Sequence, residues 1–127
     1  MRVFFYASTE TAGAKRFVEL VQIFIPGKSL EIFDSIDGIS ARLRAPRIEP
    51  IITVIQVASR HELTNILHIS ELVDDTNLFL VLPDRRPDTV SQGLRLRPRY
   101  ITYNDADFLT GAAVLKKMMD LVIIKNE

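Results

Sequence analysis

The chain has 127 residues, of which 47% are hydrophobic and 25% charged, and its 16 basic residues balance its 16 acidic ones. This length suits one domain with an ordinary hydrophobic core, so we expect residues 1–127 to form a single domain. The apolar content excludes a generally disordered chain, and the zero net charge argues against nucleic acid or a membrane surface as the partner. The absence of cysteine excludes disulfides, thiolate catalysis and cysteine-built metal sites.

No run of the sequence approaches the ~20 apolar residues that a membrane-spanning helix needs. The first residues, MRVFFYAST, turn polar too early for the apolar part of a signal peptide. Together with the lack of cysteine, these features predict a cytoplasmic protein without membrane contact.

Short apolar runs alternate with stretches of helical periodicity along the whole chain. A buried strand is expected at residues 2–7, followed by a helix that a hydroxyl of Ser8, Thr9 or Thr11 caps and that Pro26 and Gly27 stop. A second strand is expected at residues 30–33, with a brief helix after it that ends near residue 45. The third strand covers residues 51–57 and is rich in β-branched side chains.

The second half of the chain repeats this alternation. A third helix after the Ser59 cap is expected to reach residue 72, and a fourth strand covers residues 78–82. A turn-rich loop and a weak helix at residues 89–94, which contains Gly93, precede the fifth strand at residues 99–103. Asp105 or Asp107 caps the last helix, which runs nearly to the end of the chain.

Strands separated by helices imply right-handed βαβ crossovers and a parallel sheet with helices on both faces. The sequence therefore predicts a three-layer α/β domain of the (βα)5 type. For five strands we expect the flavodoxin-like order 2-1-3-4-5, which places a ligand crevice at the carboxyl ends of strands one and three.

The order, spacing and length of these elements resemble the receiver domain of bacterial two-component response regulators over essentially the whole chain. Asp37-Gly38 near the second helix, and the Tyr100-x-x-Tyr103 strand that leads into the last helix, also match. The resemblance implies a CheY-like fold and a role in signal transduction.

A working receiver carries an acidic pair after strand one, an aspartate after strand three, a hydroxyl after strand four and a lysine after strand five. These groups hold a magnesium ion and the transferred phosphoryl group. In this chain the positions fall at Tyr6 and Ala7, near Val57 or Ala58, at Leu82 or Pro83, and at Tyr103. The resemblance therefore implies a pseudo-receiver that is not phosphorylated: no enzyme, with no catalytic residue, metal or cofactor, acting by protein–protein interaction.

Five arginines crowd the stretch from strand four to strand five. Guanidinium groups suit carboxylates and phosphates, so the stretch is interpreted as a protein-docking face, with a solvated and locally paired surface as the alternative. The balanced charge favours a protein partner over nucleic acid. Tyr100 matches the strand-five aromatic that reports activation in receivers, and the alternative is a simple strand aromatic. The docking residues are Arg85, Arg86, Arg95, Arg97, Arg99 and Tyr100.

The last helix has more apolar side chains than one buried stripe needs. Large exposed apolar areas usually mean association, and methionine adapts well to interfaces. We expect a homodimer or a partner contact through Met118, Leu121, Val122 and Ile124.

A second function stays open. The segment Ser8-Thr9-Glu10-Thr11-Ala12-Gly13 opens a helix after strand one, where flavodoxins bind the flavin phosphate with a hydroxyl-rich loop. The flavodoxin-like pattern Thr-x-Thr-Gly-Asn-Thr reads Thr-x-Thr-Ala-Gly-Ala here and is incomplete. The alternatives are a binder of a phosphate-bearing small molecule through Ser8, Thr9, Thr11 and Gly13, or simple helix capping.

Overall fold

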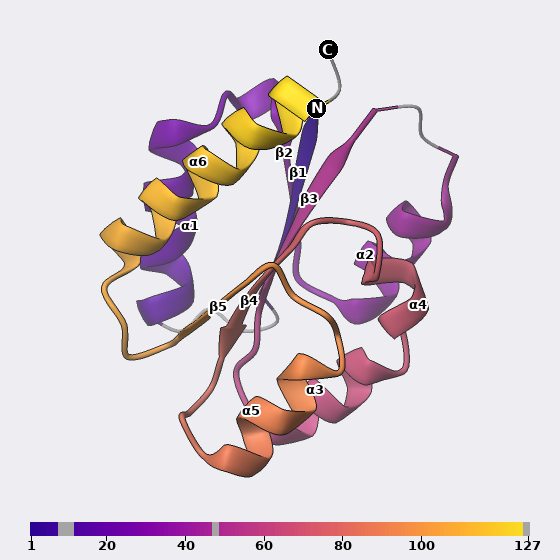
Figure 1. The fold of residues 1–127 in the computed structure, drawn as a ribbon, viewed down its shortest axis with the longest axis vertical. Coiled ribbons are helices and arrows are strands. Elements are labelled where there is room, and N and C mark those ends of the chain that lie inside the picture. The colour runs from indigo at the N-terminus through magenta and orange to yellow at the C-terminus, as the bar shows by residue number, and fades with distance from the viewer. Residues whose placement is uncertain (8–11, 47–48, 126–127) are drawn as a thin grey trace.

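The computed structural model describes residues 1–7, 12–46 and 49–125, with backbone alone for residues 12–14 and 123–125. Five strands form one parallel sheet in the order β2-β1-β3-β4-β5 (Figure 1). The predicted flavodoxin-like fold and its strand order are therefore confirmed. The strands are β1 (Arg2–Ala7), β2 (Leu30–Phe33), β3 (Ile51–Gln56), β4 (Leu78–Leu82) and β5 (Tyr100–Tyr103).

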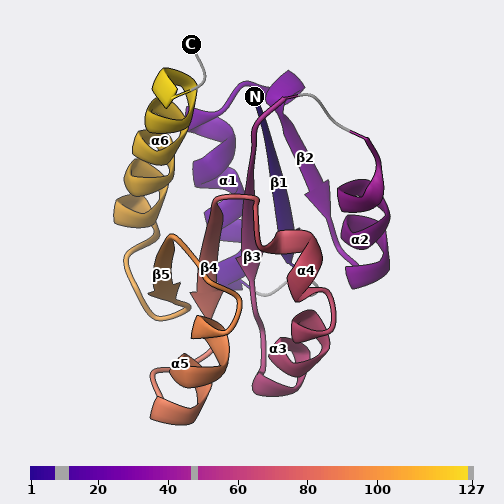
Figure 2. The ribbon, with the colours of Figure 1, turned by 45° about the vertical axis from the view of Figure 1, so that its right-hand side comes forward.

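Helices cover both faces of this sheet, as Figures 1 and 2 show. One face carries α1 (Ala12–Phe24) and α6 (Phe108–Lys125), which pack against each other. The other face carries α2 (Ile36–Arg44), α3 (Arg60–Leu67), α4 (Ser70–Val73) and α5 (Pro87–Leu94). A short 3-10 helix, η1 (Gly27–Ser29), precedes β2. None of the described helices combines the length and the apolarity that crossing a membrane takes.

The apolar core has two layers, one on each side of the sheet. Successive residues of β1 point to opposite faces, so Phe4 lies in the layer under α2 to α5, and Val3 and Phe5 lie in the layer under α1 and α6. All three side chains are fully buried. Burial on both faces explains why β1 has no polar alternation in its sequence.

The predicted third helix is two helices in the structure, which corrects the expectation of one helix from Ser59 to residue 72. The amides of His68 and Ile69 bond to the carbonyls of Asn65 and Ile66, three residues earlier. This tighter bonding ends α3, and α4 begins at Ser70. Apolar side chains from both helices still reach the core, so the hydrophobic periodicity alone did not reveal the break.

Side-chain caps fix where the helices begin. Ser35 Oγ accepts a hydrogen bond from the Gly38 amide at 3.0 Å, and Ser59 Oγ accepts one from the Glu62 amide at 3.2 Å. For α6, Asp107 Oδ1 accepts from the Leu109 amide at 2.9 Å, which settles the choice between Asp107 and Asp105. The caps predicted for α1 lie outside the described residues.

Gly93 lets α5 approach β4 closely. A Cβ atom at this position would lie 3.0 Å from Leu82 Cδ2 and 3.2 Å from Leu80 Cδ2, closer than carbon atoms pack. Gly93, which weakened the sequence prediction of this helix, is therefore the residue that lets the helix pack closely on the sheet.

Candidate functional site at the carboxyl edge of the sheet

Parallel strands bring their carboxyl ends to one edge of the sheet, where doubly wound domains bind ligands. At this edge Ala7 lies beside Gln56, and Leu82 lies beside Tyr103. Tyr6, Val57 and Leu82 have exposed fractions of 2% or less and belong to the core. Strand β3 ends at Gln56, one residue before the predicted end at Val57. An amide side chain, that of Gln56, therefore ends the strand, one residue before the position near Val57 or Ala58 at which the resemblance expects a carboxylate.

Asn104, directly after β5, ties together the ends of three strands. Its Nδ2 donates to the Val57 carbonyl at 2.8 Å, and its backbone amide donates to the Leu82 carbonyl at 3.0 Å. Because a carbonyl can only accept, the Val57 contact fixes the orientation of the Asn104 side chain. The remaining Oδ1 then accepts from Gln56 Nε2 at 3.0 Å.

Gln56 depends on Asn104 for its only side-chain hydrogen bond within the described structure. The glutamine is 4% exposed, and its Oε1 is buried without a hydrogen-bond partner among the residues that the structure describes. Buried polar groups in proteins are normally bonded, and an orphaned one costs about 1–3 kcal/mol. The Gln56–Asn104 pair is therefore the polar centre of this edge.

Arg85, in the loop after β4, lies against the loop after β5. Its guanidinium makes hydrogen bonds of 3.0 to 3.3 Å to both Asp105 carboxylate oxygens and lies 4.2 Å above the centre of the Tyr103 ring. The hydrogen bonds from Arg85 lower the pKa of Asp105, and those to Asp105 raise the pKa of Arg85. Both side chains are largely exposed, so this ion pair stabilises the fold weakly. It does neutralise the two charges beside Asn104.

Asp84 shapes the turn into α5. Its Oδ1 accepts a hydrogen bond from the Arg86 amide at 2.9 Å, and this bond lowers the pKa of Asp84. Asp84 follows β4 rather than β3, so it does not stand at the strand end that Gln56 occupies. Its observed role is local turn chemistry.

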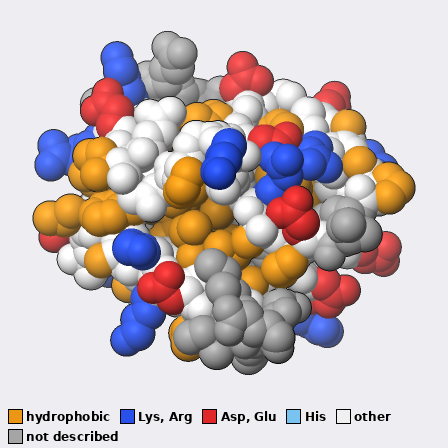
Figure 3. Space-filling model, turned by 90° about the horizontal axis from the view of Figure 1, so that it is seen from above, with side chains coloured by type: hydrophobic (Ala, Val, Ile, Leu, Met, Phe, Trp, Pro, Cys, Tyr) orange, Lys and Arg blue, Asp and Glu red, His pale blue; other side chains and the backbone are white. Residues whose placement is uncertain are grey.

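The five predicted docking arginines do not lie together. Arg85 and Arg86 follow the carboxyl end of β4, whereas the Arg99 amide donates to the carbonyl of Leu78, the first residue of β4. The eight residues of α5, about 12 Å in length, separate the two groups. Figure 3 shows basic and acidic side chains interspersed on the face seen from above. The second group consists of Arg95, Arg97 and Arg99.

Tyr100 lies at the start of β5 and packs in the layer under α1 and α6. Its ring centre is 4.9 Å from that of Phe79, and the side chain is partly exposed. This is the packing of a strand aromatic, and a switching role for Tyr100 stays a prediction.

The residues expected on the association surface divide between core and surface. Val122 is 6% exposed and packs in the core, so the structure corrects its place on that surface. Leu121 is 52% exposed, Met118 is partly buried, and the side chain of Ile124 lies outside the described part. Figure 3 shows hydrophobic side chains on the left, the side of α1 and α6 in Figure 1, and also in the centre and on the right of the face seen from above.

The alternative phosphate-binding segment lies largely outside the described residues. This is the case for Ser8, Thr9 and Thr11, and Gly13 is described only as backbone within α1. Phosphate binding there stays a prediction. Within residues 1–7, 12–46 and 49–125, no group of three or more histidine, aspartate and glutamate side chains could hold a metal ion.

Sequence reasoning missed the Gln56–Asn104 pair, whose members are 48 residues apart. Two features of the sequence could have indicated this pair. Gln56 is a polar residue at the end of an apolar strand, and Asn104 directly follows another strand. Comparison of the chain with protein-family models, with curated proteins and with solved structures gives no match.

Proposed function

We propose that this protein is a non-catalytic, receiver-like signalling or regulatory domain of the cytoplasm, which acts by protein–protein contact and is not phosphorylated. The observation that carries the proposal is the Gln56–Asn104 pair at the carboxyl edge of the sheet. An amide lacks the anionic oxygen with which an aspartate accepts a phosphoryl group. The Asn104 amide donates to the Val57 carbonyl and accepts from Gln56.

The same edge suits regulation by a partner. Tyr103, Asn104 and Asp105 are consecutive residues. Asn104 bonds to Gln56, and its two neighbours contact Arg85, so one short segment makes both sets of contacts. A partner carboxylate that binds Arg85 in place of Asp105 would therefore change the contacts of Tyr103 and Asp105, the two residues that flank Asn104. The difference between the partner's affinities for two conformations of this segment sets how far the partner can shift the equilibrium between them.

For the contact surface we propose the α1–α6 face and a second copy of the chain. Ile23 on α1 is 73% exposed, and Leu109 and Leu121 on α6 are 55% and 52% exposed. The two helices pack side by side over the same core layer, so these apolar side chains lie on one side of the sheet. Exposed apolar side chains on one face favour association, and a two-fold dimer is the commonest way to cover them.

Phosphoryl transfer tests the non-catalytic part of this proposal. The protein is incubated with acetyl phosphate and Mg²⁺, and its intact mass is measured beside an active receiver domain treated in the same way. We expect an unmodified mass, because the strand end carries an amide instead of a carboxylate. A stoichiometric, acid-labile phosphoryl adduct on this protein would contradict the proposal.

A further inference from the structure

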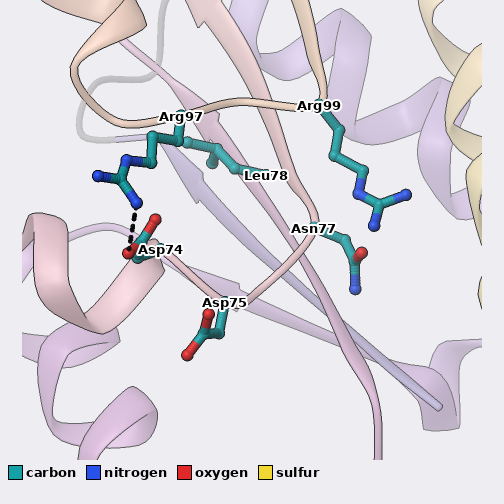
Figure 4. A pocket seen from close by; sticks show the side chains of 6 residues that line it. All are labelled: Asp74, Asp75, Asn77, Leu78, Arg97 and Arg99. Atoms are coloured by element: carbon teal, nitrogen blue, oxygen red, sulfur yellow. Dashed lines mark ion pairs between the residues drawn. The ribbon is translucent and has the colours of Figure 1, made fainter.

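A polar pocket lies at the amino edge of the sheet, opposite the Gln56–Asn104 pair. Its volume is about 220 Å³, and among the described residues that line it Leu78 is the one apolar residue. Figure 4 shows that its arginines come from the segment before β5 and its aspartates and asparagine from the segment before β4. An adjoining hollow of about 200 Å³ shares Asp74 and Arg97 with it. The pocket is lined by Asp74, Asp75, Asn77, Leu78, Arg97 and Arg99.

The described lining residues carry two positive and two negative charges, so their net charge is zero. Among them, one arginine and one aspartate form an ion pair, and the other two charged side chains do not. Arg97 Nη1 lies 3.6 Å from Asp74 Oδ2, which is a loose ion pair rather than a hydrogen bond. The side chains of Asp75 and Arg99 make no hydrogen bond or ion pair with any described residue. Figure 4 shows Arg97 turned toward Asp74, and Arg99 turned the other way, on the side of Asn77. Asp75 and Arg99 are both exposed to solvent, so this open pocket offers one accessible carboxylate and one accessible guanidinium.

The backbone holds two of the lining residues in unusual conformations. Asn77 and Arg97 both have φ of 53°, in the left-handed region. Asparagine tolerates this region, and Asn77 Nδ2 is anchored to the Ile51 carbonyl at 2.9 Å. Arg97 follows the end of α5, where its amide bonds to the Leu94 carbonyl at 3.1 Å, a position that usually carries glycine.

Arg97 thus strains the backbone without contributing burial, since its side chain is 78% exposed. Glycine would satisfy the same backbone geometry with less strain. The arginine side chain instead pairs with Asp74 at the pocket. Strained residues of this kind concentrate at ligand sites.

We propose that this pocket binds a small zwitterion, a molecule that carries an ammonium and a carboxylate group a few bonds apart. Arg99 binds the carboxylate through charge-assisted hydrogen bonds, and Asp75 binds the ammonium. Arg97 neutralises Asp74, which would otherwise repel the carboxylate. The pocket is open to solvent and smaller than the ~300–1,000 Å³ sites of drug-sized ligands, which favours a ligand of amino-acid size. This inference is independent of the proposed function, which rests on the opposite edge.

Chain length and charge of the ligand provide the test. The ¹⁵N-labelled protein is titrated with glycine, β-alanine, 4-aminobutanoate and 6-aminohexanoate, and with butylamine and butanoate as ligands of one charge. We expect one amino acid of the series to shift the amide resonances of residues 74–78, 95–97 and 99 with a Kd of about 1 mM, at least about tenfold tighter than either singly charged ligand. Equal effects of the singly charged ligands, or shifts located elsewhere, overturn the proposal.

Variants identify the groups that bind. Arg99→Gln and Asp75→Asn are each expected to weaken binding about tenfold, whereas Arg95→Gln, which lines only the adjoining hollow, leaves it unchanged. Arg97→Gly is expected to weaken binding while the Tm stays the same or rises by about 2–5 °C. Unchanged binding in Arg99→Gln and Asp75→Asn, or a lower Tm in Arg97→Gly, overturns the assignment.

Discussion

Replacing Asn104 with alanine is expected to lower the free energy of unfolding by about 2–4 kcal/mol. The change removes the hydrogen bonds of the side chain to Val57 and Gln56. It leaves Gln56, which is 4% exposed, with no hydrogen bond from its side chain to the described part of the protein. Urea denaturation, followed by circular dichroism, measures the loss. A change below about 0.5 kcal/mol would show that Asn104 does not hold this edge together.

The matched control removes the buried amide itself. Gln56→Met keeps the size and shape of the side chain and eliminates the orphaned Oε1, so we expect a change within about 1 kcal/mol. In the double variant, Asn104→Ala is expected to cost about 1–2 kcal/mol less than in the wild type, because no buried amide is left unpaired. Additive effects of the two changes would mean that the pair is not coupled.

Replacing Phe17 with alanine is expected to lower the free energy of unfolding by about 3–5 kcal/mol, the largest effect of any single change considered. Phe17 on α1 is fully buried, and its ring centre lies 5.1 Å from that of Phe108 and 5.5 Å from that of Phe5. A third ring, that of Phe79, lies 5.8 Å away. The alanine variant leaves a cavity where β1, β4, α1 and α6 meet, which these close-packed rings cannot fill.

Thermal and urea unfolding measure this effect, with Gln22→Ala on the same helix as the control. Gln22 is exposed, so its replacement is expected to change the stability by less than about 0.5 kcal/mol. A loss below about 1 kcal/mol for Phe17→Ala would contradict the packing of α1 on the sheet.

The sheet could be predicted from the sequence because its signals are local. Strands β1, β2 and β4 have the predicted bounds, since each is a short apolar run with a turn or helix signal after it. The strand order was expected because it is the leading topology for a doubly wound sheet of so few strands, and the structure confirms it. The break between α3 and α4 could not be predicted, since both sides of it keep the same apolar periodicity.

The candidate site could be predicted only in part. The expected receiver positions Tyr6, Val57 and Leu82 are buried in the core, and the comparison with a receiver stays a prediction. It did not indicate that Gln56 and Asn104 bond to each other, because that contact joins segments 48 residues apart. It also placed five arginines on one surface. Helix α5 runs back along the sheet between them, so arginines that are close in sequence lie near opposite edges of the sheet.

The measurement that most directly tests the account is the mass of the native protein in solution, by sedimentation equilibrium over a range of concentrations. We predict a dimer that Leu121→Asp dissociates, weakening association by at least about 100-fold, because an interface cannot bury unpaired charges. Leu94→Asp is the matched control, since Leu94 is 56% exposed on the opposite face of the sheet. A wild-type monomer at every concentration, or equal dissociation by Leu94→Asp, would contradict association through the α1–α6 face.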